Sequence, residues 1–155
     1  MGTNGLKVER FFTSRDTDPF NIEYEKRTST IRNPDGSVVS EMRDIEVPKD
    51  WSQVATDILA QKYFRKAGIP KIGSETSVKQ VVGRMSGCWR DWGEKNGYFA
   101  SAEDAECYEQ EMQYMLLHQM GAPNSPQWFN TGLQWAYGLT GSAQGHYYYD
   151  EAAGK

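Results

Sequence analysis

Apolar positions recur with a helical period in three successive stretches of the chain. In the first stretch, Asp50 is a candidate N-cap, and Gly68 and Pro70 are expected to stop the helix. Its apolar positions, spaced three and four residues apart, are Trp51, Val54, Ala55, Ile58, Leu59 and Phe64. This spacing predicts an amphipathic helix that follows Asp50.

The second helical stretch begins near Ser77 and ends at Gly97. Its apolar face comprises Val78, Val81, Val82, Met85, Cys88, Trp89 and Trp92. Gly83 and Gly87 lie one turn apart inside it, and each costs about 1 kcal/mol relative to alanine in a helix. We therefore expect a close helix contact at these glycines.

The third helical stretch opens at Ser101, and Asp104 three residues later resembles the second half of a capping box. One face carries Tyr108, Met112, Met115, Leu116 and Gln119. Gly121 and Pro123 mark its end. His118 flanks the apolar face, where a structural histidine is expected rather than a catalytic base.

Before the helices the pattern becomes typical of strands. Residues 28–32 and 37–47 carry β-branched residues in partial alternation and flank the segment 33–36, NPDG. Pro34 presets the φ angle of a turn, and Gly36 supplies its unhindered position. One face of the second strand would carry Val39, Glu41, Arg43 and Ile45. Because that face mixes charged and apolar residues, we expect a partly exposed hairpin.

Neither end of the chain has such a period. Residues 1–20 predict a loose arm in which Phe11 and Phe12 dock on the body. Residues 124–137 are rich in aromatics and predict a strand, with a turn at 130–132. The glycine-rich residues that follow have no apolar period, and the chain stops as a cut edge would.

These patterns divide the chain into three parts. We expect a loose N-terminal arm over residues 1–20 and a hairpin plus helical domain over residues 21–123. Residues 124–155 would form a separate C-terminal part with a Gly- and Tyr-rich tail. In that tail His146 is followed by three tyrosines, Tyr147 to Tyr149, which favour an interaction surface over a radical-carrying tyrosine.

Composition narrows the class of protein. The chain has 155 residues, of which 38% are hydrophobic and 25% charged, so it fits one globular domain rather than a disordered polyelectrolyte. No apolar run reaches the roughly 20 residues of a membrane helix, and the start lacks a signal sequence, so a cytoplasmic chain is expected. The net charge of −4 argues against general nucleic-acid binding. A single-stranded nucleic-acid binder using the aromatic residues is the weakest interpretation.

The residues available for metal or redox chemistry are few. Cys88 and Cys107 form no CxxC pair, and neither has His118 or His146 at a metal-ligand spacing. We expect two reduced, buried thiols and no metal site. No phosphate-binding glycine loop, zinc-protease motif or nucleophile elbow is present in the sequence.

The segment from Pro123 to Gly132, PNSPQWFNTG, carries the candidate binding chemistry. Pro123 and Pro126 bracket an Asn-Ser pair, which favours an extended backbone and holds the Ser125 hydroxyl on a stiff segment. The turn at 130–132 would supply exposed N–H groups. Such a segment suits the sugar or phosphate edge of a ligand, although a plain structural loop fits the residues as well.

This segment resembles the mouth of the catalytic barrel of ribonucleotide reductases, where a Ser/Thr-Pro step precedes an Asn-x-Gly turn. Upstream segments resemble the N-terminal region of bacterial class II, adenosylcobalamin-dependent reductases, and the resemblance covers about residues 7–149. These segments are EYEKRTS, IRNPDGSVV, VPKDWSQVATDILAQKYFRKAG, SVKQVVGRMSGCWRDWGEKNGYF and YMLLHQMGAPNSPQWFNTGLQWAYG.

The resemblance implies an α+β fold: an N-terminal β-hairpin, a three-helix module, and the first strand of an incomplete ten-stranded α/β barrel. In this family a thiyl radical on a barrel cysteine drives reduction of a ribonucleotide to a 2′-deoxyribonucleotide for DNA synthesis, with adenosylcobalamin as the cofactor. The Ser/Thr of the family's Ser/Thr-Pro step contacts substrate, so Ser125 is the implied substrate-binding residue.

The family's Asn-x-Cys-x-Glu pattern, which holds the radical cysteine, is absent from this sequence. Cys88 lies in SGCWR and Cys107 in AECYE, so no catalytic residue carries over. The resemblance therefore implies an isolated chain that is inactive and binds no cofactor, with the remainder of the barrel and a ribonucleotide as its partners. The alternative is a stand-alone or split-enzyme module that docks on a separate reductase barrel.

Overall fold

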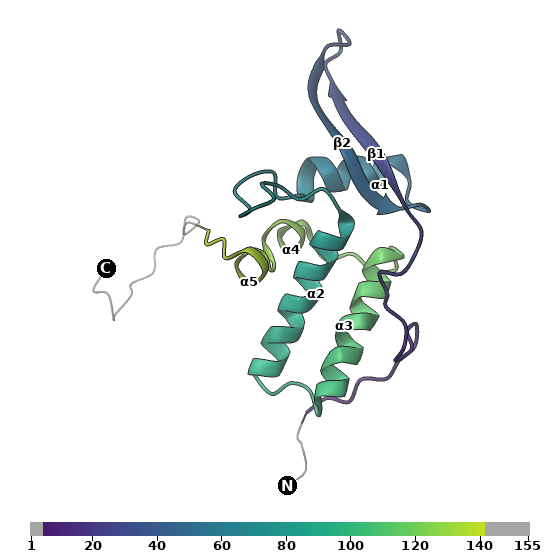
Figure 1. Ribbon diagram of the computed structural model, residues 1–155, viewed down its shortest axis with the longest axis vertical. Coiled ribbons are helices and arrows are strands. Elements are labelled where there is room, and N and C mark those ends of the chain that lie inside the picture. The colour runs from purple at the N-terminus through teal and green to yellow at the C-terminus, as the bar shows by residue number, and fades with distance from the viewer. Residues whose placement is uncertain (1–4, 142–155) are drawn as a thin grey trace, which may run out of the picture.

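A long antiparallel hairpin stands on a body of helices, in which α2 and α3 lie side by side (Figure 1). The structure is a computed structural model, and it describes residues 5–141. Its elements are β1 (Tyr24–Arg32), β2 (Val38–Pro48), α1 (Gln53–Ile58), the π-helical turn η1 (Leu59–Tyr63), α2 (Val78–Lys95), α3 (Ala102–Leu117), α4 (Ser125–Asn130) and α5 (Leu133–Tyr137). The predicted α+β class, with a hairpin followed by helices, is confirmed.

The hairpin turn forms where the sequence predicts it. Gly36 has a φ of +86°, and its N–H donates to the carbonyl of Asn33 at 2.9 Å. A β-bulge then shifts the register, because Arg27 pairs with Ile45 whereas Ser29 pairs with Met42. The extra residue breaks the period of two, so Ile45 shares the face of Met42 and becomes buried. The prediction that Ile45 shares a face with Arg43 was wrong.

The first helix begins two residues later than expected. Ser52, not Asp50, is the N-cap, since the Ser52 hydroxyl accepts from the N–H of Ala55 at 3.1 Å. The helix ends in a π-helical turn in which the N–H of Phe64 donates to Leu59 at 3.0 Å. It therefore stops at Tyr63, before the expected breakers.

The second and third helices begin at the predicted caps. Ser77 and Gln80 form a full capping box at α2, and Ser101 caps α3 by accepting from the N–H of Asp104. A Cβ built on Gly87 would lie 2.3 Å from the indole of Trp135 in α5, which confirms the expected close helix contact there. At Gly83 the nearest atom is 3.9 Å away, so no close contact exists at that position.

The apolar face predicted for α3 is buried only in part. Tyr108, Met112 and Met115 are only half-buried, whereas Leu116 is buried as predicted. His118 follows the helix as its C-cap residue and is exposed, and its ring packs against that of Tyr114 in a tilted arrangement, with a centroid distance of 4.1 Å. Both cysteines are free and buried, as expected.

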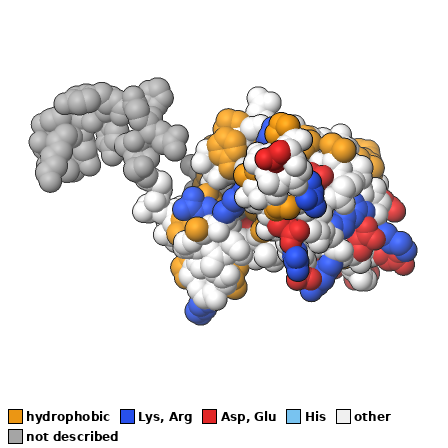
Figure 2. Space-filling model, turned by 90° about the horizontal axis from the view of Figure 1, so that it is seen from above, with side chains coloured by type: hydrophobic (Ala, Val, Ile, Leu, Met, Phe, Trp, Pro, Cys, Tyr) orange, Lys and Arg blue, Asp and Glu red, His pale blue; other side chains and the backbone are white. Residues whose placement is uncertain are grey.

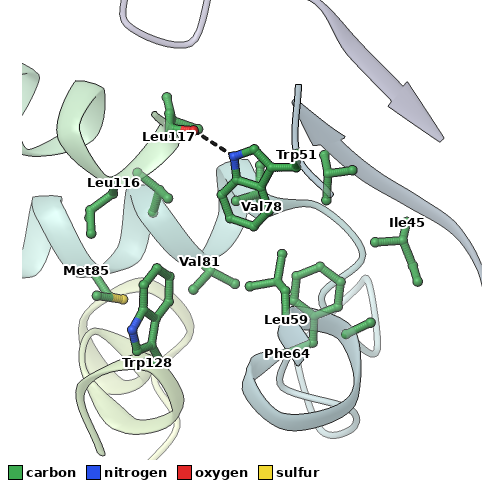
Figure 3. Packing of buried hydrophobic residues seen from close by; sticks show 13 residues of the cluster. Ile45, Trp51, Leu59, Phe64, Val78, Val81, Met85, Leu116, Leu117 and Trp128 are labelled. Atoms are coloured by element: carbon green, nitrogen blue, oxygen red, sulfur yellow. Dashed lines mark hydrogen bonds between the residues drawn. The ribbon is translucent and has the colours of Figure 1, made fainter. Parts of the chain in front are cut away.

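The hydrophobic core lies where the base of the hairpin meets the helices (Figure 3). Its side chains come from β2 and the turn after it, from η1 and the residue that follows it, from α2, from the end of α3, and from α4: Ile45, Val47, Trp51, Leu59, Ala60, Phe64, Val78, Val81, Val82, Met85, Leu116, Leu117 and Trp128. The indole N–H of Trp51 donates to the carbonyl of Leu117 at 2.7 Å and so ties the hairpin base to α3. The hairpin tip takes no part in this core.

The described part of the N-terminal arm lies against α3. Phe12 stacks on Tyr114 with a centroid distance of 5.3 Å, which confirms half of the docking prediction. Phe11 is 79% exposed, so the other half was wrong. The carboxylate of Glu111 accepts from the N–H groups of Phe12 and Thr13 at 3.1 and 2.9 Å. Burial opposes ionisation of Glu111, but the Thr13 and Phe12 hydrogen bonds outweigh it and lower its pKa.

The strand predicted for residues 124–137 was wrong. The described part of this segment, residues 124–141, contains the short helices α4 and α5 and no strand. The reason is that Pro126 occupies the first turn of α4, where a missing N–H is tolerated, instead of extending the backbone. The Gly- and Tyr-rich tail with His146 lies outside the described residues. Within the described residues, no helix has the length and apolar character needed to cross a membrane.

Candidate functional site

Ser125, the predicted substrate-binding residue, is the first residue of α4 and is exposed. Asn124 before it is extended, with a ψ of 153°, as the sequence predicts, whereas Ser125 itself is already helical. Its hydroxyl lies 3.0 Å from the hydroxyl of Tyr63, and either oxygen can donate. The structure thus pairs two hydroxyl groups that are 62 residues apart in the sequence.

Both the backbone and the side chain of Tyr63 are fixed in position. It closes the π-helical turn η1, a local geometry that often occurs at functional sites. Its ring stacks with Trp128 at 5.6 Å and with Phe129 at 6.5 Å, both on α4. The aromatic contacts and the hydroxyl pair therefore fix α4 against the end of the first helix.

A buried ion pair anchors α4 from the other side. The Arg84 Nε on α2 donates to Glu75 at 2.7 Å, and the two side chains are only 1% and 0% exposed. The Arg84 guanidinium also donates to the carbonyls of Thr131 and Trp128, at 2.6 and 2.5 Å. Such charge-assisted, fully satisfied bonds are strong and directional. Arg84 thus holds the carboxyl end of α4 on α2.

Glu75 is the acceptor at the centre of this cluster. Besides Arg84, it accepts from the backbone N–H of Arg65 at 2.8 Å and from the hydroxyl of Tyr137 at 3.0 Å. Burial and the neighbouring Glu75 charge raise the pKa of Tyr137, so its phenol stays protonated and donates. We call Glu75, Arg84 and Tyr137 the buried charge cluster. It joins α2, α5 and the loop before α2.

The turn between α4 and α5 is packed rather than exposed. A Cβ on Gly132 would lie 2.1 Å from the Arg84 carbonyl oxygen, and Gly132 has a φ of +81°. Thr131 is buried, and its N–H donates to Gln127 at 3.0 Å. The prediction of exposed N–H groups at residues 130–132 was therefore wrong at Thr131. Of the predicted segment, Ser125 offers an exposed polar group.

An apolar groove of about 260 Å³ lies beside the hydroxyl pair. It is lined by Trp51, Ala55, Ile58, Leu59, Tyr63, Leu116, Gln119, Gly121, Ala122, Pro123 and Trp128. No lining side chain is charged, and Tyr63 both lines the groove and contacts Ser125. Within residues 5–141, no three His, Cys, Asp or Glu side chains are arranged to hold a metal ion.

Sequence reasoning missed Tyr63 and the buried charge cluster. Arg84 did carry a signal, because it lies on the apolar face of α2 between Val81 and Cys88, where a charged residue needs a buried partner. Glu75 precedes the helix in a polar stretch and gave no comparable signal. Tyr63 continues a helical apolar pattern, which hides its exposed hydroxyl.

Comparison with known proteins identifies relatives over nearly the whole chain. A family model described as "Class II vitamin B12-dependent ribonucleotide reductase" matches residues 25–119. The "Vitamin B12-dependent ribonucleotide reductase" of Bradyrhizobium diazoefficiens is 46% identical over 97% of this chain, as is that of Agrobacterium fabrum. The protein of that name from Streptomyces coelicolor is 45% identical over 83%.

The relatives are much longer than this chain. The matched region spans 15% of the Bradyrhizobium protein, 14% of the Agrobacterium protein and 13% of the Streptomyces protein. The chain belongs to the class II vitamin B12-dependent ribonucleotide reductase family, of which it represents the N-terminal region.

Proposed function

We propose that this chain works as the N-terminal part of an enzyme that reduces ribonucleotides to 2′-deoxyribonucleotides for DNA synthesis. In this proposal it precedes a ten-stranded α/β barrel and brings Ser125 to the ribonucleotide at the barrel mouth. The observation that carries the proposal is the exposed Ser125 hydroxyl, held 3.0 Å from Tyr63 on an anchored helix. Family membership supports the reaction class.

Ser125 has hydrogen-bonding capacity to spare for a ligand. A hydroxyl has one donor and two acceptor lone pairs, and the contact with Tyr63 uses only one of these. The remaining capacity suits a ribose hydroxyl or a phosphate oxygen. Because stacking and the buried charge cluster fix α4, little conformational entropy would be lost when the ligand binds.

The two cysteines do not offer reactive thiols. Cys88 and Cys107 are each 2% exposed, and burial raises the pKa of both thiols. A buried thiol with a raised pKa is a poor nucleophile at neutral pH. This supports the proposal that the radical and redox cysteines belong to the remainder of the enzyme and that the isolated chain is inactive.

Cobalamin is proposed for the parent enzyme because the relatives are named vitamin B12-dependent. When bound, adenosylcobalamin supplies the radical that starts the reaction. The one described histidine, His118, packs its ring against Tyr114 in a tilted arrangement. We therefore assign no cobalamin contact to this chain.

A second candidate is a split-enzyme or stand-alone module that docks on a separate reductase barrel. The uncharged groove beside Ser125 favours docking of this kind, because apolar grooves are common at interfaces. Both candidates share the partner, the body of a reductase. They differ only in whether the two parts are covalently joined.

The proposal can be tested in a chimera in which this chain replaces the matching N-terminal residues of the Bradyrhizobium relative. We expect Ser125→Ala to lower kcat/KM for ribonucleotide about 10-fold, since a hydrogen bond to substrate is worth on the order of 1 kcal/mol or more. Ser40→Ala is the matched control, because Ser40 is an exposed serine on β2. Equal kcat/KM values for the two variants would refute the role of Ser125.

A further inference from the structure

The surface around the groove differs from the rest of the molecule in its chemistry. No side chain that lines the groove is charged. By contrast, another surface hollow is lined by Arg10, Arg15, Arg90, Ala102, Glu103 and Glu106. In the view of Figure 2, hydrophobic side chains gather along the upper edge of the body, and many Lys, Arg, Asp and Glu side chains lie along its lower right edge. The groove is therefore suited to an apolar partner.

The rim of the groove exposes large apolar side chains. Ile58, which lines the groove, is 41% exposed, and Val54 one helical turn before it is 66% exposed. Phe129 is 42% exposed and stacks on Tyr63, another lining residue. Side chains four residues apart lie on one helix face, so Val54 and Ile58 form a continuous apolar stripe. The stripe, the groove and Phe129 together make one surface, which we call the apolar face.

Small residues widen the access to this face. Ala55, Gly121 and Ala122 line the groove and leave room for side chains of a partner to enter. A stable interface involves about 20–30 residues on each partner, whereas eleven residues line the groove. Contact would therefore extend from the groove over Val54, Ile58 and Phe129.

The occupant follows from the length of the relatives and the position of Ser125. About 85% of the Bradyrhizobium protein lies outside the region that this chain matches. Ser125 contacts Tyr63 at the edge of the apolar face. A ribonucleotide that contacts both Ser125 and the remainder of the enzyme requires that remainder to meet the chain here.

We propose that the apolar face is the docking surface for the remainder of the reductase, and that an uncharged, apolar segment of that body fills the groove. This inference rests on the proposed function, because it takes the partner to be the reductase body. It adds the face that is covered and the chemistry of the segment that covers it. The exposed hairpin tip and the charged side of the molecule stay outside the interface.

Hydroxyl-radical footprinting tests the proposal without any substitution. The oxidation of Phe129 is measured in the isolated chain and in the chimera described above, with Phe11, 79% exposed on the N-terminal arm, as the matched control. We expect Phe129 to be protected about five-fold or more in the chimera and Phe11 less than about two-fold, as expected of a buried interface. Protection of Phe11 with Phe129 still reactive would overturn the proposal.

A pair of substitutions sharpens the result. Ile58→Asp places a charge on the apolar face, and Val39→Asp places one on the 58% exposed Val39 of the hairpin. In the chimera we expect Ile58→Asp to lower turnover about 10-fold and Val39→Asp to change it by less than about two-fold. Equal effects would refute the face. If Ser125→Ala alone has no effect, the role of Ser125 fails, and the protection of Phe129 and the effect of Ile58→Asp decide the docking face separately.

Two further measurements cover the other outcomes. If the chimera does not fold, amide exchange in the intact Bradyrhizobium relative, across the segment aligned with residues 119–131, reports burial of the same surface. Fast exchange there would overturn the proposal.

Sedimentation of the isolated chain shows whether a second copy is the occupant. A dimer whose footprint covers Phe129 would replace the reductase body as partner and refute the inference.

Discussion

The hairpin and the region around α4 use similar charged residues in opposite ways. On the hairpin, Lys26 and Asp44 pair at 3.8 Å with side chains 70% and 75% exposed. At the base of α4, the Arg84–Glu75 pair is 1% and 0% exposed. Water and salt screen the first pair, and its net contribution is small. The second pair has no water to replace either partner, so the fold depends on both.

This difference shows which charges organise the molecule. The hairpin keeps its shape through backbone pairing and its turn, and its surface charges are replaceable. The α4 region lacks a long helix or a strand of its own, and Arg84 joins its carbonyls to α2. Substitutions of charged residues in the two regions should therefore differ by several kcal/mol in their effect on the free energy of unfolding.

The largest effect is expected for Arg84→Ala. It leaves the Glu75 carboxylate buried without its partner and removes the donors to Trp128 and Thr131, so we expect a loss of about 3–5 kcal/mol in the free energy of unfolding. Urea unfolding measures this value. Arg43→Ala on the hairpin should cost less than about 0.5 kcal/mol. Similar losses for both variants would remove the distinction between the two regions.

Gly132→Ala should have the next largest effect. The added Cβ would lie 2.1 Å from the carbonyl oxygen of Arg84. The alanine would also have to adopt a φ of +81°, a backbone conformation that residues with a side chain rarely adopt. We expect a loss of about 2–4 kcal/mol from crowding and strain together. The hairpin control, Gly36→Ala, has a φ of +86° but open space around it, so only about 1–2 kcal/mol should be lost. Thermal unfolding of both variants separates crowding from backbone strain.

Glu111 is an intermediate case between the two regions. Its pKa is lower in the folded chain than its ordinary value of 4.5, so the unfolded chain binds more protons in the window below that value. The stability from Glu111 is therefore fully present at neutral pH and is lost as the pH falls through this window. Glu111→Gln should cost about 1–2 kcal/mol at pH 7 and flatten the acid limb of the stability profile.

The control for Glu111 is Glu41→Gln on the hairpin, whose carboxylate pairs with Arg43 at 2.5 Å near the surface. We expect Glu41→Gln to change the free energy of unfolding at pH 7 by less than about 0.5 kcal/mol. An unchanged acid limb in Glu111→Gln would show that the contacts of the arm with α3 do not contribute to stability.

The smallest effect is expected for the exposed ion pair between Lys26 and Asp44 on the hairpin. A double-mutant cycle on Lys26 and Asp44 should give a coupling below about 0.5 kcal/mol, and the coupling should vanish in about 1 M salt. A coupling above about 2 kcal/mol, or one insensitive to salt, would contradict the view that the hairpin charges are replaceable.

Local signals predicted the hairpin turn and the helix starts at Ser77 and Ser101, because caps and turns depend on neighbouring residues. The bulge at Asp44 could not be predicted, since it depends on which side chains of the hairpin base reach the core. The helices α4 and α5 were missed for a similar reason. The carbonyls of Trp128 and Thr131, at the end of α4, accept from an arginine 44 and 47 residues away in the sequence, and Tyr137 of α5 donates to Glu75, which is 62 residues away.

For the candidate site, sequence reasoning found Ser125 but not its surroundings. The resemblance of the segment around Ser125 to a reductase motif pointed to its hydroxyl. Tyr63 and Glu75 meet this region only in the folded chain, 62 and 9 residues from Ser125 and Arg84 respectively. Such contacts are set by tertiary packing, which a single sequence does not record.

Turnover of the chimera tests the central claim most directly. Deoxyribonucleotide formation would be measured with adenosylcobalamin, a dithiol and a ribonucleotide, for the isolated chain and for the chimera with the Bradyrhizobium body. The account predicts product from the chimera and none from the isolated chain, whose cysteines are buried. Product from the pure 155-residue chain, or a folded chimera without activity, would contradict it.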